Sequence, residues 1–255
     1  MATVDINADL GEGETVTPTD LAVLDAVTSA SVACGFHAGS PQMMRDSASA
    51  CLDRGVVIGA HISFRDRAGF GRRRLPFEHA QLVADIVEQC AILEDVVATV
   101  GGKVSFVKPH GALYNSMGSD PAAAASVVEA VSGHGPWVLL AQPGTVVVDL
   151  ARRAGLTVIL EGFPDRGYLA DGRLASRDEA GALVSNDAIV AERALSLVRR
   201  GGVVALDGAW TPVEADTICI HGDAPGAART ARTVRAALDA DGVVVASFIN
   251  PATPP

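Results

Sequence analysis

The feature that most constrains the fold is a regular alternation of two kinds of segment along the chain. Short runs rich in Val, Ile and Leu alternate with longer Ala-rich stretches of helical period. This alternation is typical of parallel strands connected by helices. Strands are expected to begin near Val4, Ser31, Val56, Val104, Trp137, Thr157, Val203 and Thr217. Helices are expected over 18–29, 41–54, 77–100, 120–132, 144–154, 185–200 and 225–240.

The alternation breaks near the carboxyl end of the chain. The segment between Leu206 and Asp216 contains a glycine and a proline and is too short for a helix. We therefore expect the strands that begin near Val203 and Thr217 to pair directly. With this break, the pattern predicts a distorted (β/α) barrel of about seven βα units, and an open doubly wound sheet is the alternative.

Composition limits the class of protein. A chain of 255 residues that is 49% hydrophobic can bury a large core, and no linker or low-complexity tract divides it, so we treat 1–255 as one domain. A formal charge of −10 opposes binding to nucleic acid or anionic lipid. No apolar run approaches the ~20 residues that cross a bilayer. Four widely spaced cysteines without a CxxC pair, and no signal-peptide pattern, predict a cytoplasmic protein with reduced thiols.

Polar, mostly glycine-containing segments follow one predicted strand after another. In a parallel barrel these carboxyl ends converge on one face, where the loops assemble an active site. Four of the six histidines, His37, His61, His110 and His221, occupy such positions. Their clustering favours acid–base or ligand chemistry over four unrelated structural roles. The segments are 5–12, 33–39, 59–61, 107–115, 161–168 and 221–223.

Carboxylates in the first of these segments are candidates for a general base. Asp5, Asn7 and Asp9 alternate with apolar residues, so their side chains are expected on one side of the strand, at the barrel mouth. Asp9, nearest the strand end, and Glu12 are the two candidate bases, and the choice between them stays open. Asp5 is read either as a site residue or as part of a structural network.

Lys108 is the clearest candidate cation. It is one of only two lysines and ends an apolar strand just before Pro109 and His110. It could bind a carboxylate or phosphate or polarise a carbonyl, the alternative being a solvated strand end. Tyr114, in the same segment, could offer its hydroxyl to a substrate or wedge the loop.

Other motifs leave the chemistry less defined. An arginine-rich segment at 65–74 is either a solvated loop or an anion or partner surface. No GxxxxGK[ST] loop, no GxGxxG after a strand and no GxSxG elbow occurs, so a self-contained nucleotide site is not predicted. The Asp and His set could bind Zn, Mn or Mg, but without HExxH-type spacing a protein-bound metal stays open.

Five motifs together make the chain resemble the LamB/YcsF family over about residues 4–240. They are ACGFHAG, GFGRR, VKPHGALYN, DRGYLADGRLASR and DTICIHGD. The resemblance implies a distorted barrel related to the glycoside hydrolase and polysaccharide deacetylase barrels. It also implies the role of the A subunit in an ATP-hydrolysing 5-oxoprolinase with two partner subunits. That enzyme would open 5-oxo-L-proline to L-glutamate, with ATP and Mg²⁺ bound through the complex.

On that interpretation the candidate residues receive roles. Asp9 or Glu12 is the general base, and Lys108 and His110 stabilise the developing oxyanion or phosphate. The remaining candidates are expected to bind the substrate. They are Asn7, His37, His61, Tyr114, Asn115, Asp165, Arg166, His221 and Asp223. Two other functions remain open, a metal-dependent deacetylase or amidohydrolase that acts alone and a non-catalytic binding subunit.

Overall fold

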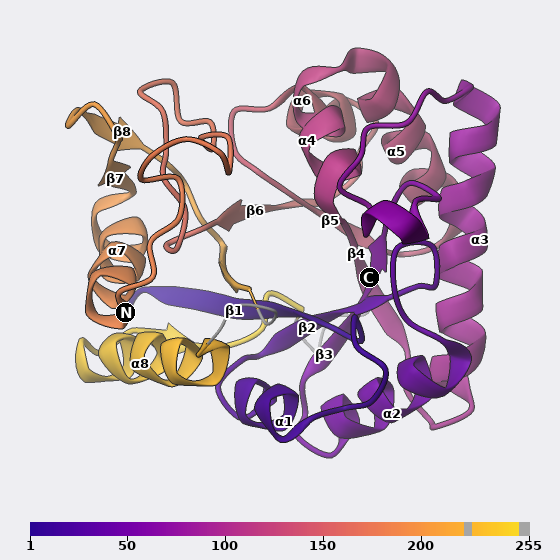
Figure 1. The fold of residues 1–255 in the computed structure, drawn as a ribbon, viewed down its shortest axis with the longest axis horizontal. Coiled ribbons are helices and arrows are strands. Elements are labelled where there is room, and N and C mark those ends of the chain that lie inside the picture. Colours follow the sequence, from indigo (N-terminus) through magenta and orange to yellow (C-terminus); the bar gives the residue numbers. More distant parts are fainter. Residues whose placement is uncertain (222–225, 250–255) are drawn as a thin grey trace.

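A computed structural model describes residues 1–221 and 226–249 and contains a closed parallel β-barrel (Figure 1). Seven strands pair in the order β1-β2-β3-β4-β5-β6-β9, and β9 also pairs with β1, which closes the barrel. The predicted barrel is therefore confirmed, and the open doubly wound sheet is excluded. The strands are β1 (Thr3–Leu10), β2 (Ser29–Ala33), β3 (Val57–Ile62), β4 (Val104–Pro109), β5 (Val138–Ala141), β6 (Val158–Gly162) and β9 (Thr217–Ile220).

Helices surround the barrel, and each barrel strand is followed by at least one of them (Figure 1). Prolines and capping side chains fix several starts. Ser40 and Asp120 accept hydrogen bonds from the first turns of α2 and α5, and Pro41 and Pro121 occupy the first positions. The helices are α1 (Pro18–Leu24), α2 (Pro41–Leu52), α3 (His79–Ala98), α4 (Gly111–Ser119), α5 (Pro121–His134), α6 (Val146–Arg153), α7 (Asp187–Arg200) and α8 (Ala227–Ala240), with the short 3-10 helix η1 (Arg67–Gly69).

Three details of the predicted elements are wrong. The strand near Val203 is β7 (Gly202–Val204), and it forms an antiparallel pair with β8 (Trp210–Pro212) outside the barrel, not with β9. The glycine-containing segment between β7 and β8 allows a tight hairpin, which sequence periodicity alone did not reveal. The helix predicted over 18–29 ends at Leu24, because Ser29 already begins β2. The segment expected as a loop after β4 contains α4.

The lower barrel interior is filled by an aromatic side chain. Phe106 is fully buried, and a Cβ at Gly59 would lie only 2.2 Å from its ring, so only glycine fits at that position of β3. The ring of Phe248 packs edge-on against Phe106, and β10 (Val244–Val245) extends the sheet beside the start of β1. The amino-terminal end of the barrel is thus packed, which leaves the carboxyl end for chemistry.

Strand register brings the polar candidates to the same level of the barrel. His61 of β3 lies opposite Lys108 of β4, and Asn7 of β1 lies opposite Cys219 of β9. In the described residues, no helix has both the length and the apolar character needed to span a membrane.

Candidate active site

A cavity of about 580 Å³ opens at the carboxyl ends of the barrel strands. Side chains from β1, β3 and β4 form its floor, and the long segment between β6 and α7 contributes one wall. The volume lies in the range usual for small-molecule sites. The predicted residues that line it are Asp9, Glu12, His61, Lys108, His110, Tyr114, Asn115, Arg166 and His221.

Lys108 is buried in the floor and surrounded by acceptors. Its Nζ lies 2.8 Å from Asp9 Oδ1, 3.0 Å from Glu161 Oε1 and 3.1 Å from Asn7 Oδ1. It also approaches Cys219 Sγ at 3.2 Å. The solvated strand end considered from sequence is therefore excluded, since only 3% of the lysine is exposed. The three N–H groups of the ammonium are matched by hydrogen bonds to Asn7, Asp9 and Cys219, and Glu161 adds an ion pair, so Lys108 acts on a substrate chiefly through its charge.

The pKa values of this group follow from its pairing. Burial alone would lower the pKa of Lys108, but the charges of Asp9, Cys219 and Glu161 raise it well above its ordinary value. Burial alone would raise the pKa of Asp9, but the charges of His61 and Lys108 lower it well below its ordinary value. Both groups are therefore charged at neutral pH.

A directed chain of hydrogen bonds runs from Lys108 down into the barrel. Asn7 accepts from Lys108 and donates through Nδ2 to Thr217 Oγ1 at 2.8 Å, and Thr217 donates to Asp5. Asp5 also accepts from Thr28 Oγ1 at 2.6 Å and from Ser29 Oγ at 2.8 Å. Of the two interpretations of Asp5, the structural network is the one observed. Asn7 is fully buried, does not line the cavity and accepts a hydrogen bond from Lys108, which it positions.

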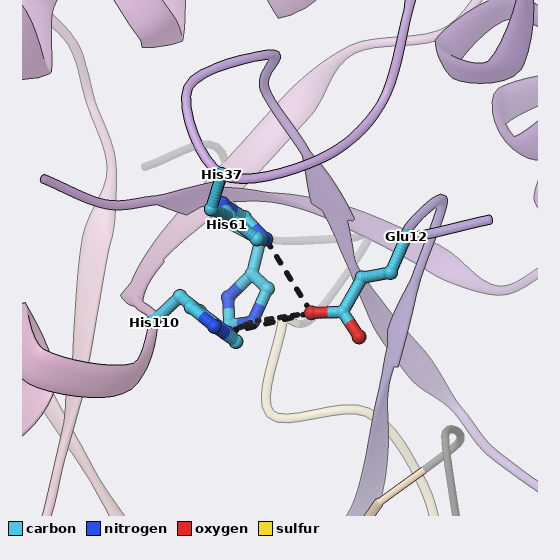
Figure 2. Close-up of side chains that lie close together, drawn as sticks. All are labelled: Glu12, His37, His61 and His110. Atoms are coloured by element: carbon cyan, nitrogen blue, oxygen red, sulfur yellow. Dashed lines mark hydrogen bonds and ion pairs between the residues drawn. The ribbon is translucent and has the colours of Figure 1, made fainter. Parts of the chain in front are cut away.

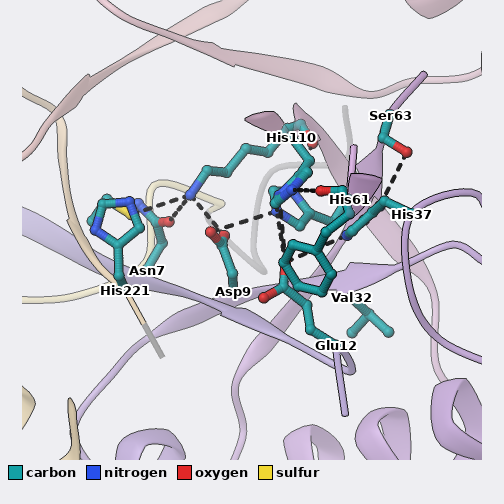
Figure 3. Close-up of polar contacts among 12 residues, drawn as sticks. Asn7, Asp9, Glu12, Val32, His37, His61, Ser63, His110 and His221 are labelled. Atoms are coloured by element: carbon teal, nitrogen blue, oxygen red, sulfur yellow. Dashed lines mark hydrogen bonds and ion pairs between the residues drawn. The ribbon is translucent and has the colours of Figure 1, made fainter. Parts of the chain in front are cut away.

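Next to the lysine, a carboxylate and three imidazoles converge (Figures 2 and 3). Glu12 Oε1 lies 3.4 Å from His37 Nε2, 3.7 Å from His61 Nε2 and 3.4 Å from His110 Nδ1. His61 Nε2 and His110 Nδ1 are 3.0 Å apart, and the rings of His37 and His110 are stacked. Asp9 Oδ2 is 3.5 Å from His61 Nε2, so Asp9 joins this group to the lysine. Glu12 and the three histidines are the set that could hold a metal ion.

The three imidazoles differ in proton affinity. Burial lowers the pKa of His37 to about 3 and that of His110 to about 3, with a further contribution from His61 in each case. Burial also opposes the charged form of His61, but the charge of Asp9 and its hydrogen bond raise the pKa of His61 above its ordinary value. The group therefore contains two neutral imidazoles beside one that gains a proton more readily.

The rim of the cavity holds the remaining charged candidates. His221 Nδ1 lies 2.6 Å from Asp165 Oδ2, and Arg177 Nη2 approaches His221 Nε2 at 3.3 Å. Arg166 lines the cavity, but its guanidinium donates to the carbonyl oxygens of Ala182 and Ala175. These two bonds show that Arg166 also braces the segment between β6 and α7. Asp223 lies outside the described residues.

The two tyrosines have different roles. Tyr168 is fully buried and its hydroxyl accepts a hydrogen bond from the Phe163 amide at 2.8 Å, so it wedges the segment after β6. Tyr114 lies in the first turn of α4 and lines the cavity with Asn115. Burial, together with the neighbouring Glu161 carboxylate, raises the pKa of Tyr114 well above its ordinary value. Tyr114 therefore presents a neutral hydroxyl at neutral pH.

The arginine-rich segment is not one basic surface. Arg65 binds Asp85 and Glu88, and Arg67 donates to backbone carbonyls of Gly35 and Gly39. Arg73 pairs with Asp66 and Arg74 with Asp120. Of the five arginines of this segment, only Arg72 lines the cavity. The charges are thus distributed among separate local contacts.

Sequence reasoning missed three residues that complete the site. Glu161 and Cys219 contact Lys108, and Ser63 Oγ lies 3.1 Å from His37 Nδ1. Glu161 carried a usable signal, because it is a charged residue at the end of an apolar strand, as Lys108 is. Cys219 and Ser63 carried none, since their types are common in buried strands and turns.

Comparison with known proteins assigns the chain to a family. The model of the LamB/YcsF family matches residues 4–253. The chain belongs to the LamB/YcsF family. Two relatives of this LamB/YcsF chain bear the name of the A subunit of 5-oxoprolinase. One is from Agrobacterium fabrum (44% identical; 98% of this chain and 99% of the relative), and the other is from Mycobacterium avium (46% identical; 97% and 100%).

A solved protein of similar fold comes from Thermus thermophilus. This "Lactam Utilization Protein" is 41% identical, with a TM-score of 0.91 over 96% of this chain and 100% of its own. The barrel and the chain length of the LamB/YcsF chain thus agree with a relative that has been solved experimentally.

Proposed function

We propose that this LamB/YcsF chain is the A subunit of a 5-oxoprolinase, which cleaves 5-oxo-L-proline to L-glutamate with hydrolysis of ATP to ADP and phosphate. The observation that carries the proposal is the buried pair of Lys108 and Asp9 at the floor of a small-molecule cavity. Relatives over nearly the full length bear the name of that subunit, which supports the choice of substrate.

The lactam bond needs activation and a proton acceptor. A five-membered lactam is a stable amide, and phosphorylation of its carbonyl oxygen by ATP makes attack by water easier. Water then adds to the carbonyl carbon, and the C–N bond breaks as the ring nitrogen takes up a proton, which leaves an acyl phosphate. A second water molecule hydrolyses the acyl phosphate and releases L-glutamate and phosphate. The ionised Asp9 carboxylate accepts a proton from the water, and the positive charge of Lys108 balances the negative charge of the phosphoryl group on the former carbonyl oxygen.

Partner subunits are part of the proposal. The sequence contains no recognisable phosphate-binding loop, so ATP with its Mg²⁺ is bound through the complex and not by this chain alone. Two partner subunits, 5-oxoproline as substrate and a cytoplasmic location follow from the same proposal. The cavity of this chain then receives the lactam.

Product analysis tests the proposal. The purified chain is incubated with 5-oxoproline and ATP, alone and with its two candidate partners, and glutamate, ADP and phosphate are quantified. We expect all three products only from the complete mixture. Rapid glutamate formation by the chain alone contradicts the role in a multi-subunit enzyme. Release of acetate from an N-acetylated substrate by the chain alone, without ATP, supports the metal-dependent amidohydrolase instead.

A non-catalytic role is separated by point variants. If this chain only shapes a partner enzyme, changes at Asp9 and Lys108 leave the turnover of the reconstituted complex near that of the wild type. If it holds the reacting lactam, both changes lower turnover strongly while the complex still assembles, as size-exclusion chromatography can show.

A further inference from the structure

The histidine cluster, defined as Glu12, His37, His61 and His110, has the dimensions of a metal site (Figure 2). Its four residues come from the ends of four neighbouring strands, β1 to β4. One atom from each converges, and four of the separations between these atoms are 3.0, 3.4, 3.4 and 3.7 Å. Ligands of a tetrahedral zinc ion at its usual bond lengths lie about 3.3 Å apart.

Hydrogen bonds on the far side of each ring assign the tautomers. His61 Nδ1 lies 3.0 Å from the Lys108 carbonyl oxygen, and His110 Nε2 lies 2.9 Å from the Phe70 carbonyl oxygen. A carbonyl only accepts, so both of these nitrogens carry hydrogen. In the neutral rings, His61 Nε2 and His110 Nδ1 are left with lone pairs, and both point into the cluster.

The tautomer of the third ring, His37, is assigned in the same way. Ser63 Oγ donates to the Phe64 carbonyl oxygen at 2.9 Å, so it accepts from His37 Nδ1 at 3.1 Å. His37 Nε2 therefore carries a lone pair and no hydrogen. This nitrogen is buried and, within the part of the chain that the structure describes, makes no hydrogen bond. All three imidazoles thus direct an acceptor toward the Glu12 carboxylate.

Such a convergence of acceptors requires a cation among them. Two lone pairs 3.0 Å apart on His61 and His110 repel each other unless a proton or a metal ion lies between them. A single shared proton satisfies that pair but leaves His37 Nε2 facing the Glu12 carboxylate as acceptor to acceptor. One metal ion satisfies all four atoms at once, and a ring whose other N–H donates to a protein oxygen is the usual state of a metal-bound histidine.

We propose that Glu12, His37, His61 and His110 bind one divalent metal ion of the zinc class. Three imidazoles and one carboxylate are ligands that zinc prefers, in a tetrahedral arrangement. Glu12, His61 and His110 also line the cavity, so the ion lies at the edge of the substrate space. The Lys108–Asp9 pair lies on the other side of His61, and the metal and the lysine then flank one cavity.

The proposal is tested on the purified full-length chain without substrate, which makes it independent of 5-oxoprolinase activity. Metal content is measured by mass spectrometry after purification and again after chelation, and Zn²⁺ or Co²⁺ is titrated back by calorimetry. We expect one equivalent to bind, and the Co²⁺ form to show the intense visible absorption of a tetrahedral site. Absence of saturable binding of either ion overturns the proposal. Absence of glutamate formation in the complex bears only on the proposed function.

Matched variants locate the ion. His37→Ala removes a ligand and should weaken Zn²⁺ binding at least about 100-fold, since loss of an outer-shell partner alone costs about 10–100-fold. Ser63→Ala keeps all four ligands, removes only the acceptor of His37 Nδ1–H, and should weaken binding about 10–100-fold. His79→Ala removes an imidazole that binds Ser126 and Glu129 on α5 and should leave affinity unchanged.

The affinities of the His37→Ala and Ser63→Ala variants decide whether the ion binds at the histidine cluster. Wild-type affinity in both His37→Ala and Ser63→Ala overturns the assignment, whatever the total metal content. If His37→Ala does not fold, Ser63→Ala decides, because the Ser63 backbone keeps its hydrogen bonds to Gln89 and the fold is preserved.

Discussion

The lysine half of the cavity floor, made by Lys108 and the residues that contact it, differs from the histidine cluster in how negative charge is balanced. In the lysine half, the chain supplies its own cation, and Lys108 is matched by Asp9 and Glu161. In the histidine cluster, three imidazole acceptors and the Glu12 carboxylate converge. Both halves lie at strand ends, and Asp9 contacts both of them (Figure 3).

The difference indicates that the charge of the lysine half is fixed, whereas the charge of the histidine cluster can change. A lysine held by three oxygens carries a permanent charge whose position is set by folding. Histidine acceptors bind a proton or a metal ion according to pH and supply. One half therefore provides a constant positive charge, and the other would supply Lewis acidity when it binds the proposed metal ion.

Asp9→Asn has the largest expected effect because Asp9 joins the two halves. The variant keeps the volume and an acceptor oxygen but removes the carboxylate charge. We expect turnover of the reconstituted complex to fall about 10²–10⁴-fold, the usual contribution of a general base. Metal stoichiometry should not change, because Asp9 is outside the proposed ligand set.

Turnover, metal content and thermal stability are measured on one preparation of Asp9→Asn. A destabilised protein whose folded fraction turns over like the wild type removes Asp9 from the catalytic residues. Glu12 is then the remaining candidate base, and the lysine half is structural.

Lys108→Ala is expected to lower turnover by at least about 10²-fold, in line with the loss of one group that stabilises an oxyanion. Stability should also fall, because Asp9 and Glu161 remain as buried carboxylates without their cation. Removal of one partner of a buried pair costs about 3–5 kcal/mol. Lys103→Ala is the matched control, since Lys103 is the only other lysine and is exposed.

A double variant separates the effect of Lys108 on turnover from its effect on stability. Adding Glu161→Gln to Lys108→Ala removes one of the two uncompensated charges and should restore part of the free energy of unfolding, measured in urea. Turnover should stay low, because the positive charge is still absent. Full recovery of turnover in the double variant would show that Lys108 serves only to neutralise Glu161.

Much of this arrangement could be predicted from periodicity and strand ends. Seven βα units and the convergence of Asp9, His61 and Lys108 follow from parallel strands whose carboxyl ends share one face. The β7–β8 hairpin did not follow, because three-residue strands carry too little periodicity. Helix α4 was hidden because it begins at Gly111 and because its second half contains Asn115, Ser116 and Gly118, which are poor helix formers.

The contacts within the site could not be predicted from the sequence for a different reason. Sequence can place a residue at a strand end, but the partners of that residue depend on register across strands that are distant in the chain. Glu161 and Cys219 come within reach of Lys108 only because β9 lies between β6 and β1. The tautomers in the histidine cluster depend on carbonyl oxygens of Lys108 and Phe70, which no residue type reveals.

Asp5→Asn tests how far the lysine half extends into the barrel, and it has the smallest expected effect. Asp5 ends the hydrogen-bond chain from Lys108 through Asn7 and Thr217. Burial raises the pKa of Asp5 from 3.8 to about 6, although hydroxyl groups around it oppose the change. Asp5 lies below the cavity, so turnover at neutral pH should change only a few-fold.

The sign of the pH effect follows from the raised pKa. Between about pH 4 and pH 6 the folded protein holds a proton on Asp5 that the unfolded chain has released. The stability that Asp5 contributes is therefore full below pH 4 and is lost as pH rises through 6. Relative to Asp5→Asn, which does not titrate, the wild type should lose about 3 kcal/mol across this window, at about 1.4 kcal/mol for each pKa unit. Urea unfolding of both proteins at pH 4, 5, 6 and 7 measures the difference. A constant difference over this range would mean that folding does not raise the pKa of Asp5 and that Asp5 is ionised throughout.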